Sequence, residues 1–330
     1  MSTPAPARSF RWQSGLVRAA KLLLLVIVGW GIHRTVLAAL EQLDQHPWQW
    51  RPGWLSLAGG IYLVGVLPAG WYWHWTMRRL GNRPRLLRSL AAYYVGHLGK
   101  YVPGKGMVVV LRAGLVRGSG VDTRLAAAAV FYETLTTMAA GGALAALLMV
   151  TWLDVRGEVT LLSVGLALAL VIPTIPPVAR RLIARLTPRG ERALVADAIS
   201  LEGTTRLVGW GVSVLVWVVL GLSLEAALLA ADADLVDPLA ELPLCTAAVA
   251  LAVVAGFLSF VPGGAVVREA VLLELLAPRY GAAPAVVGAV LLRLAWLGAE
   301  LATAAGIWIA SLRDRRKLGG AHPGADDRNG

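Results

Sequence analysis

The sequence FVPGG at residues 260–264 interrupts a long apolar region, and the sequence YVPGK at residues 101–105 repeats its pattern of aromatic residue, valine, proline and glycine. An arginine follows each copy, Arg268 in one case and Arg112 in the other. An apolar arm precedes each copy, and an amphipathic segment and then a long apolar segment follow it. Because internal repetition decides how a chain is divided, the two stretches predict two copies of one unit, each built around a broken helix.

Each break has a physical cause. Proline lacks the backbone N–H and clashes with the preceding turn, so a helix ends before it, and glycine tolerates conformations that other residues avoid. Within lipid, such a break is tolerated only where protein covers it or where it faces a watery cavity. A helix that restarts there presents free N–H groups and the positive end of its dipole, which favours an anion such as a phosphate. Arg268 and Lys105 would add to that positive field.

The composition indicates an integral membrane protein. Of 330 residues, 57% are hydrophobic and only 15% are charged, whereas soluble domains average about 25% charged residues. The net charge of +11 could suggest nucleic acid, but the positive residues flank apolar segments and form no basic domain. This distribution is the one that the positive-inside bias of membrane proteins produces, so no nucleic-acid partner is expected.

The sequence offers little for metal or cofactor chemistry. Cys245 is the single cysteine, so it can form neither an intramolecular disulfide nor a cysteine-based zinc site. The five histidines have no ligand spacing, and the nucleotide-binding and nucleophile motifs are absent. We therefore expect no metal, no cofactor and no enzymatic activity.

Segment length predicts an all-α polytopic fold with six full spans and two re-entrant hairpins. The spans are expected at about residues 22–40, 53–77, 125–152, 159–178, 207–231 and 285–312. The arm at residues 89–102 is too short to cross a hydrocarbon core of about 30 Å as a helix. It and the arm at residues 244–261 each lead into a Pro-Gly break and a second helix, ending near Gly120 and Tyr280. For the first apolar segment, a cleaved signal peptide is the alternative interpretation.

Loop charges orient the two units in opposite directions. The loop after residue 77 is basic and lacks acids, which indicates the cytoplasmic side. The loop that contains Asp232, Asp234, Asp237 and Glu241 lacks positive residues, which indicates the external side. The first hairpin thus follows an inward-going span and the second an outward-going one. Inverted repeats with broken helices near the midplane are typical of alternating-access transporters.

These features divide the chain and place it in the inner membrane as a multi-pass protein with both termini cytoplasmic. The predicted parts are a basic N-terminus (1–21), membrane repeat one (22–179, break at 101–105), a basic cytoplasmic linker (180–206), membrane repeat two (207–312, break at 260–264) and a cytoplasmic tail (313–330).

Charges inside membrane spans are costly and point to function by default. Glu133 and Arg293 each lie about thirty residues after their Pro-Gly break, which suggests equivalent positions with opposite charge. Trp296 and Glu300 share a helical face with Arg293. Such faces could line a hydrophilic cavity for a lipid headgroup, with arginine on the phosphate. They could equally form structural salt bridges between packed helices, and both interpretations stay open.

The candidate substrate-binding residues lie at the two breaks and on the helices that follow them. They are Pro103, Gly104, Lys105, Arg112, Glu133, Pro262, Gly263, Gly264, Arg268, Glu269, Arg293 and Glu300. Lys100 lies beside the first break, and for it, Lys105 and Arg112 the alternative is a side chain that snorkels to the interface.

The run from Phe260 to Leu276, followed by LLRL at residues 291–294 and by Glu300, resembles the membrane region of lysylphosphatidylglycerol synthases and the wider flippase-like family that shares it. The resemblance covers about residues 21–312. The first repeat fits less well, because YET at residues 132–134 stands where many members have a Glu-Arg pair.

The resemblance implies a translocator of an anionic lipid or a lipid-linked headgroup, with aminoacylated lipids, polyprenyl-linked sugars and hopanoids as candidate cargo. The hairpin tips would bind the headgroup near the midplane, and rocking of the repeats would change its access. No soluble aminoacyl-transfer domain follows Leu312, so synthase activity is not expected. Expected partners are anionic or polyprenyl-linked membrane lipids, with a homo-oligomer or envelope-synthesis enzymes left open.

Two other classes compete with a translocator. A non-transporting scaffold for envelope synthesis would tolerate replacement of the buried charges. A membrane enzyme using lipid-linked sugars would need a carboxylate cluster at one interface, and only the loop at Asp232 offers one.

Overall fold

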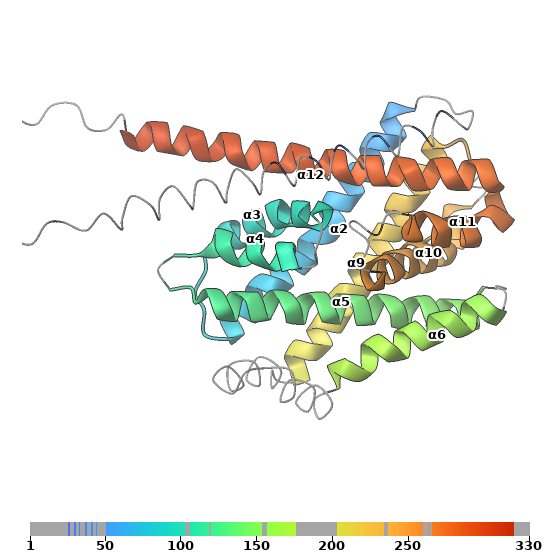
Figure 1. The fold of residues 1–330 in the computed structure, drawn as a ribbon, viewed down its shortest axis with the longest axis horizontal. Helices are drawn as coiled ribbons and strands as arrows, with labels where there is room; N and C mark the ends of the chain where they lie inside the picture. Colours follow the sequence, from blue (N-terminus) through green and yellow to red (C-terminus); the bar gives the residue numbers. More distant parts are fainter. Residues whose placement is uncertain are drawn as a thin grey trace, which may run out of the picture.

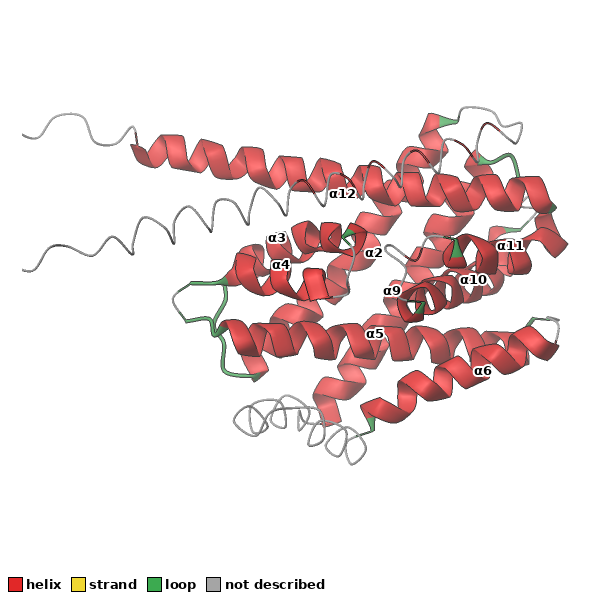
Figure 2. Ribbon diagram, viewed as in Figure 1, coloured by secondary structure: helices red, strands yellow, loops and turns green. Residues whose placement is uncertain are grey.

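The computed structural model describes residues 51–102, 106–118, 120–153, 157–175, 203–233, 237–259, 264 and 266–319, together with residues 26, 30, 33, 37, 41 and 44. Within this part the regular elements are helices joined by loops, without a strand (Figures 1 and 2). They are α2 (Pro52–Arg79), α3 (Leu86–His97), the 3₁₀ turn η1 (Leu98–Tyr101), α4 (Gly106–Val116), α5 (Thr123–Thr151), α6 (Gly157–Val171), the 3₁₀ turn η2 (Ile172–Thr174), α9 (Gly203–Ala230), α10 (Pro238–Leu258), α11 (Val267–Tyr280) and α12 (Ala282–Gly319).

Five of the described helices are long and apolar enough to cross a membrane, which confirms an all-α polytopic protein. They are Pro52–Arg79, Thr123–Thr151, Gly203–Ala230, Pro238–Leu258 and Ala282–Ser311. Four of them coincide with the spans predicted at residues 53–77, 125–152, 207–231 and 285–312. The last continues as helix to Gly319, into the predicted tail.

The span predicted at residues 159–178 is shorter than expected in the described part. Helix α6 has 15 residues and ends in a 3₁₀ turn that contains Pro173. Proline removes the donor that the next helical turn would need. Most of the predicted first span (22–40) and of the predicted linker (180–206) lies outside the described residues.

The second hairpin arm differs from the prediction in its starting point. Helix α10 begins at Pro238 and has 21 residues, so it is long enough to cross the membrane, whereas α3 has only 12. Asp237 caps α10 by accepting a hydrogen bond from the Leu239 N–H at 3.0 Å. Glu241, assigned to an external loop from its charge, lies in the first turn of α10 and accepts hydrogen bonds from Arg279 and Tyr280 of α11. Acidic residues that suggested a loop therefore begin a helix.

The helices pack in a pattern that relates two units, the first comprising α2–α6 and the second α9–α12. At the centre α2 packs against α9 (Figure 1). Around them, α5 contacts α10 and α9, while α12 contacts α3 and α2. Exchanging α2, α3, α4 and α5 with α9, α10, α11 and α12 leaves the α2–α9 contact unchanged and converts the contacts of α5 into those of α12. In both units the two hairpin helices also pack against each other, α3 on α4 and α10 on α11.

Glycine allows helices α5 and α9 to approach closely, as is typical of helix packing in membranes. Gly141 of α5 lies against the indole of Trp217 on α9, where a Cβ atom would be 2.5 Å from the ring. Trp217 is 1% exposed, and its Nε1 donates a hydrogen bond to the Thr137 carbonyl at 2.8 Å. The indole is therefore held in place and cannot easily yield to a larger residue.

We expect Gly141→Ala to destabilise the protein by about 1–3 kcal/mol, because the added methyl group overpacks this crossing. Thermal unfolding of the purified protein in detergent measures the change. Gly165→Ala in α6 is the matched control, since a Cβ there meets no atom within 4 Å. Equal unfolding temperatures for the two variants would contradict the close contact.

Candidate functional site

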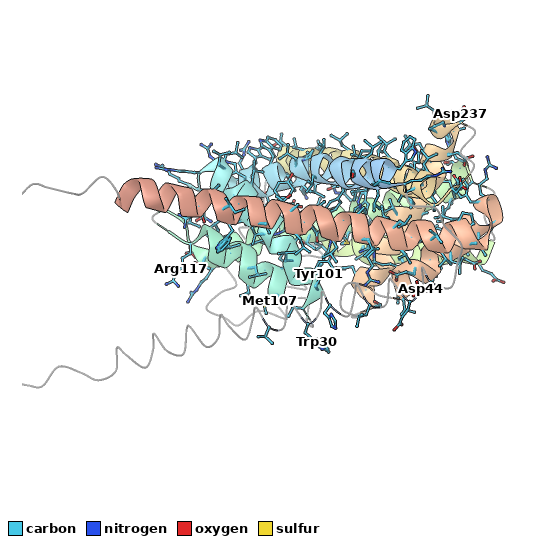
Figure 3. The ribbon with its side chains drawn as sticks, turned by 90° about the horizontal axis from the view of Figure 1, so that it is seen from above. Trp30, Asp44, Tyr101, Met107, Arg117 and Asp237 are labelled. Atoms are coloured by element: carbon cyan, nitrogen blue, oxygen red, sulfur yellow. The ribbon has the colours of Figure 1, made fainter. Side chains whose placement is uncertain are left out.

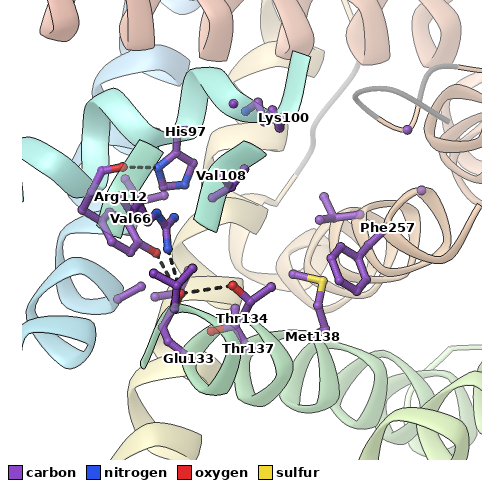
Figure 4. A pocket seen from close by; sticks show the side chains of 18 of the residues that line it. Val66, His97, Lys100, Val108, Arg112, Glu133, Thr134, Thr137, Met138 and Phe257 are labelled. Atoms are coloured by element: carbon purple, nitrogen blue, oxygen red, sulfur yellow. Dashed lines mark hydrogen bonds and ion pairs between the residues drawn. The ribbon is translucent and has the colours of Figure 1, made fainter. Parts of the chain in front are cut away.

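A cavity of about 390 Å³ lies inside the bundle, between helices of both units (Figure 4). Its wall is mainly apolar and aromatic, and the acidic and basic side chains that reach it come from both hairpins and from α5. They are His97, Lys100, Arg112, Glu133 and Arg268. A cavity of this size and lining is typical of a binding site for a small molecule or a headgroup.

One buried ion pair forms the wall between α4 and α5. Arg112 Nη1 donates to Glu133 Oε2 at 2.9 Å, and each side chain is only 4% exposed. In Figure 4 the two side chains point toward each other across the dashed line. The Tyr93 hydroxyl donates to the other carboxylate oxygen at 3.0 Å, and the Arg112 guanidinium lies 3.8 Å from the centre of the Tyr93 ring. Arg112 therefore turns into the protein, in contrast to the snorkelling alternative.

A second buried carboxylate, Glu300 of α12, binds Lys100, which lies in η1 at the end of the first arm of the first hairpin. The Lys100 ammonium lies 2.5 Å from Glu300 Oε1, to which the Tyr62 hydroxyl also donates a hydrogen bond. The ammonium is also 5.2–5.9 Å from the ring centres of Tyr62, Tyr101 and Trp296. Aromatic faces attract cations at such distances, so Lys100 is held by a carboxylate and an aromatic cage.

A third pair joins the second hairpin to the helix that follows it. Arg293 Nη1 of α12 donates to Glu269 Oε1 of α11 at 2.6 Å. Each of the two predicted intramembrane charges thus pairs with the second arm of its own hairpin. The order of charge is reversed, with the carboxylate on α5 in the first unit and on α11 in the second. Glu133 also lines the cavity, whereas Arg293 is not one of the lining residues.

Arg268 differs from the other cations. Within the described part of the chain no carboxylate pairs with it, and its charged end lies 5.1 Å from the centre of the Trp296 ring. Gly256 before the break and Gly264 at its end lie against the aliphatic part of the side chain. A Cβ added to Gly256 would be 2.6 Å from the Arg268 Cγ, and a Cβ added to Gly264 would be 2.8 Å from the Arg268 Cδ. Gly264 has φ of +66°, in the region that favours glycine. The break thus holds an arginine against the cavity that forms no ion pair with a described carboxylate, since the neighbouring Glu269 pairs with Arg293.

The structure places part of the predicted site at this cavity. Arg112, Glu133, Gly264 and Arg268 line it, Glu300 reaches it through Lys100, and Glu269 and Arg293 pair beside it. Pro103, Gly104, Lys105, Pro262 and Gly263 lie outside the described residues.

Sequence reasoning missed the tyrosines that bind the buried carboxylates. Tyr62 lies on α2 and Tyr93 on α3, and both hydroxyls donate to a glutamate. The signal was the helical spacing of Tyr62, Val66, Ala69 and Trp73 along one buried face of α2. His97, on the cavity wall, bonds through Nδ1 to the Tyr93 carbonyl at 3.0 Å.

Comparison with known proteins identifies one family. Residues 17–300 match the family model described as the lysylphosphatidylglycerol synthase TM region. Searches of curated proteins and of solved structures give no match for the chain.

Proposed function

The chain belongs to the family of the lysylphosphatidylglycerol synthase transmembrane region, and we propose that it translocates lipids with an anionic headgroup across the inner membrane. The observation that carries this proposal is Arg268, a cation on the wall of an intramembrane cavity with which no described carboxylate forms an ion pair. Charged residues within membrane proteins are costly and are kept where they serve a pathway or a ligand.

The chemistry of the wall suits a phosphate. The planar guanidinium offers paired donors that match two phosphate oxygens, and Lys100 and Arg112 add positive potential from the first hairpin. The remaining wall is mainly apolar and aromatic, as expected for a space that also borders acyl chains. Phe131 of α5 lines the cavity and is nevertheless 61% exposed, so the wall adjoins the lipid-facing exterior there. A headgroup would occupy the cavity while its chains stay in lipid.

We propose further that the two units are inverted repeats that alternate the access of the cavity. The exchange of helix neighbours between α2–α5 and α9–α12, together with the opposite loop charges, supports this arrangement. Alternating access by rocking of one repeat against the other needs a site between them, and the cavity draws its wall from both units. In this proposal both termini are cytoplasmic.

A non-transporting scaffold is the second candidate, and the ion pairs that close within each unit favour it. Arg112–Glu133 and Arg293–Glu269 could serve packing alone, since buried pairs can fix the register of helices. A scaffold does not need the positive charge of Arg268. Replacing this residue should therefore impair a translocator and leave a scaffold functional. An enzyme is not proposed, because Asp232 pairs with Arg51 and Glu133 is the one carboxylate on the described cavity wall.

We expect Arg268→Ala to lower lipid translocation by about tenfold to a hundredfold, because a charge-assisted hydrogen bond contributes about 1.5–3 kcal/mol. Proteoliposomes with fluorescent lipids, quenched from outside, measure translocation, and size-exclusion chromatography verifies folding. Arg117→Ala is the control, because Arg117 points away from the bundle in Figure 3. A wild-type rate in a folded Arg268→Ala protein would reject the site and favour the scaffold.

A further inference from the structure

The charged groups at the cavity leave a net charge. Its wall and immediate surroundings hold four cations and three carboxylates among the described side chains, which sums to a single positive charge. They are Lys100, Arg112, Arg268 and Arg293 on one side and Glu133, Glu269 and Glu300 on the other. His97 counts as neutral, which is the usual state of an imidazole at pH 7. Lys105 lies outside the described residues and outside this count.

The excess charge can be assigned to one residue. Each carboxylate has its own cation, at 2.5 Å for Lys100, 2.9 Å for Arg112 and 2.6 Å for Arg293. Arg268 remains without a carboxylate of its own among the described residues, and Gly256 and Gly264 lie against its aliphatic part. Its partial exposure is therefore exposure to the cavity that it lines.

This balance limits the ligands that the cavity can hold. In a low-dielectric site an uncompensated charge is costly, so the complex is most stable when the ligand brings the site to neutrality. A ligand with one negative charge does so. A pyrophosphate leaves an excess of negative charge, a zwitterion leaves the site positive, and a cationic headgroup adds repulsion.

We infer that the cavity selects lipids whose headgroup carries a net charge of minus one, a phosphodiester with otherwise neutral substituents, over pyrophosphate-linked, zwitterionic and net-positive headgroups. The inference rests on the proposed function in taking the ligand to be a lipid. It excludes two cargoes that the sequence leaves open, the aminoacylated lipids of net positive charge and sugars linked through a pyrophosphate.

Competition binding tests the charge rule directly. The full chain in an uncharged detergent binds phosphatidylglycerol labelled on an acyl chain, and fluorescence polarisation follows its displacement. The competitors are unlabelled phosphatidylglycerol (net −1), phosphatidylcholine (0), cardiolipin (−2), lysylphosphatidylglycerol (+1) and glycerophosphoglycerol, which has the headgroup without chains. We expect phosphatidylglycerol to compete at concentrations roughly tenfold or more below each of the others. Equal competition by the zwitterion or the dianion would overturn the charge rule, and equal competition by glycerophosphoglycerol would show a site for soluble phosphodiesters.

Variants of Arg268 test whether this residue is the source of the charge preference. Arg268→Gln should remove the advantage of phosphatidylglycerol over phosphatidylcholine, because the site is then neutral before binding. Arg268→Lys should keep the advantage, since the charge remains, and Arg117→Gln should leave affinity and preference unchanged. A folded Arg268→Gln protein that still prefers the monoanion would overturn the assignment.

Translocation of the same lipids separates this inference from the proposed function. If the protein binds the monoanion selectively and moves no lipid, the charge rule stands and the translocator fails. If it moves lipids of every charge at equal rates, the translocator stands and the charge rule fails.

Discussion

Replacing Glu133 by leucine should lower the free energy of unfolding by about 3–5 kcal/mol, the cost of leaving a buried charge without its partner. Arg112 is 4% exposed and has Glu133 as its carboxylate, so the variant leaves the guanidinium with little besides the Tyr93 ring. The Tyr93 hydroxyl loses its acceptor as well. Unfolding of the purified protein in mixed micelles, followed by circular dichroism, measures the loss.

The control for Glu133→Leu is an ion pair with similar chemistry and different burial. Arg51 and Asp232 pair at the end of the bundle with side chains 36% and 55% exposed. Arg51→Leu should therefore cost at most about 1 kcal/mol. The double variant Arg112→Leu with Glu133→Leu should recover most of the stability, since both charges are gone. If the double variant is as unstable as Glu133→Leu alone, the loss comes from packing and the electrostatic explanation is wrong.

Gly264→Ala should cost about 2–4 kcal/mol of stability, from backbone strain and overpacking together. Its φ of +66° penalises any side chain, and a Cβ would lie 2.9 Å from the Gly256 Cα, which is backbone and cannot rotate away. The same Cβ would lie 2.8 Å from the Arg268 Cδ. The arginine must shift, so binding of the anionic lipid should fall together with stability.

Unfolding and lipid binding are measured on the same sample. Gly298→Ala in α12 is the matched control, because a Cβ added at Gly298 meets no atom within 4 Å. In a helix interior this change is neutral or stabilises by up to about 1 kcal/mol. A Gly264→Ala protein with wild-type stability and affinity would mean that the close approach at the break is unimportant.

The spans were predictable because lipid requires long apolar helices, and four of the predicted ranges match described helices within a few residues. The start of α10 was not predictable, because the charge of Glu241 by itself favours a loop. Its partner Arg279 lies 38 residues away, and nothing local in the sequence shows that the two residues meet. The span predicted at residues 159–178 was likewise too long, because the helix ends at Val171 and a 3₁₀ turn containing Pro173 follows.

The candidate site was predictable in its charges and not in their pairing. Glu133, Arg268 and Arg293 stand out because ionised residues are rare inside spans. Which residues pair depends on how each helix is rotated about its axis, and Lys100 meets Glu300 across 200 residues. The isolated state of Arg268 follows only once the other pairs are known. Sequence reasoning therefore named the cations and could not say which one remained available.

Of the three ion pairs that the described residues form around the cavity, only Lys100–Glu300 joins one unit to the other, whereas Arg112–Glu133 and Glu269–Arg293 each close within a unit. In the proposed cycle each hairpin would therefore travel with the helix that follows it. The Lys100–Glu300 contact at the cavity would have to break or shift in each cycle, and its lifetime would then influence how often the cavity changes side.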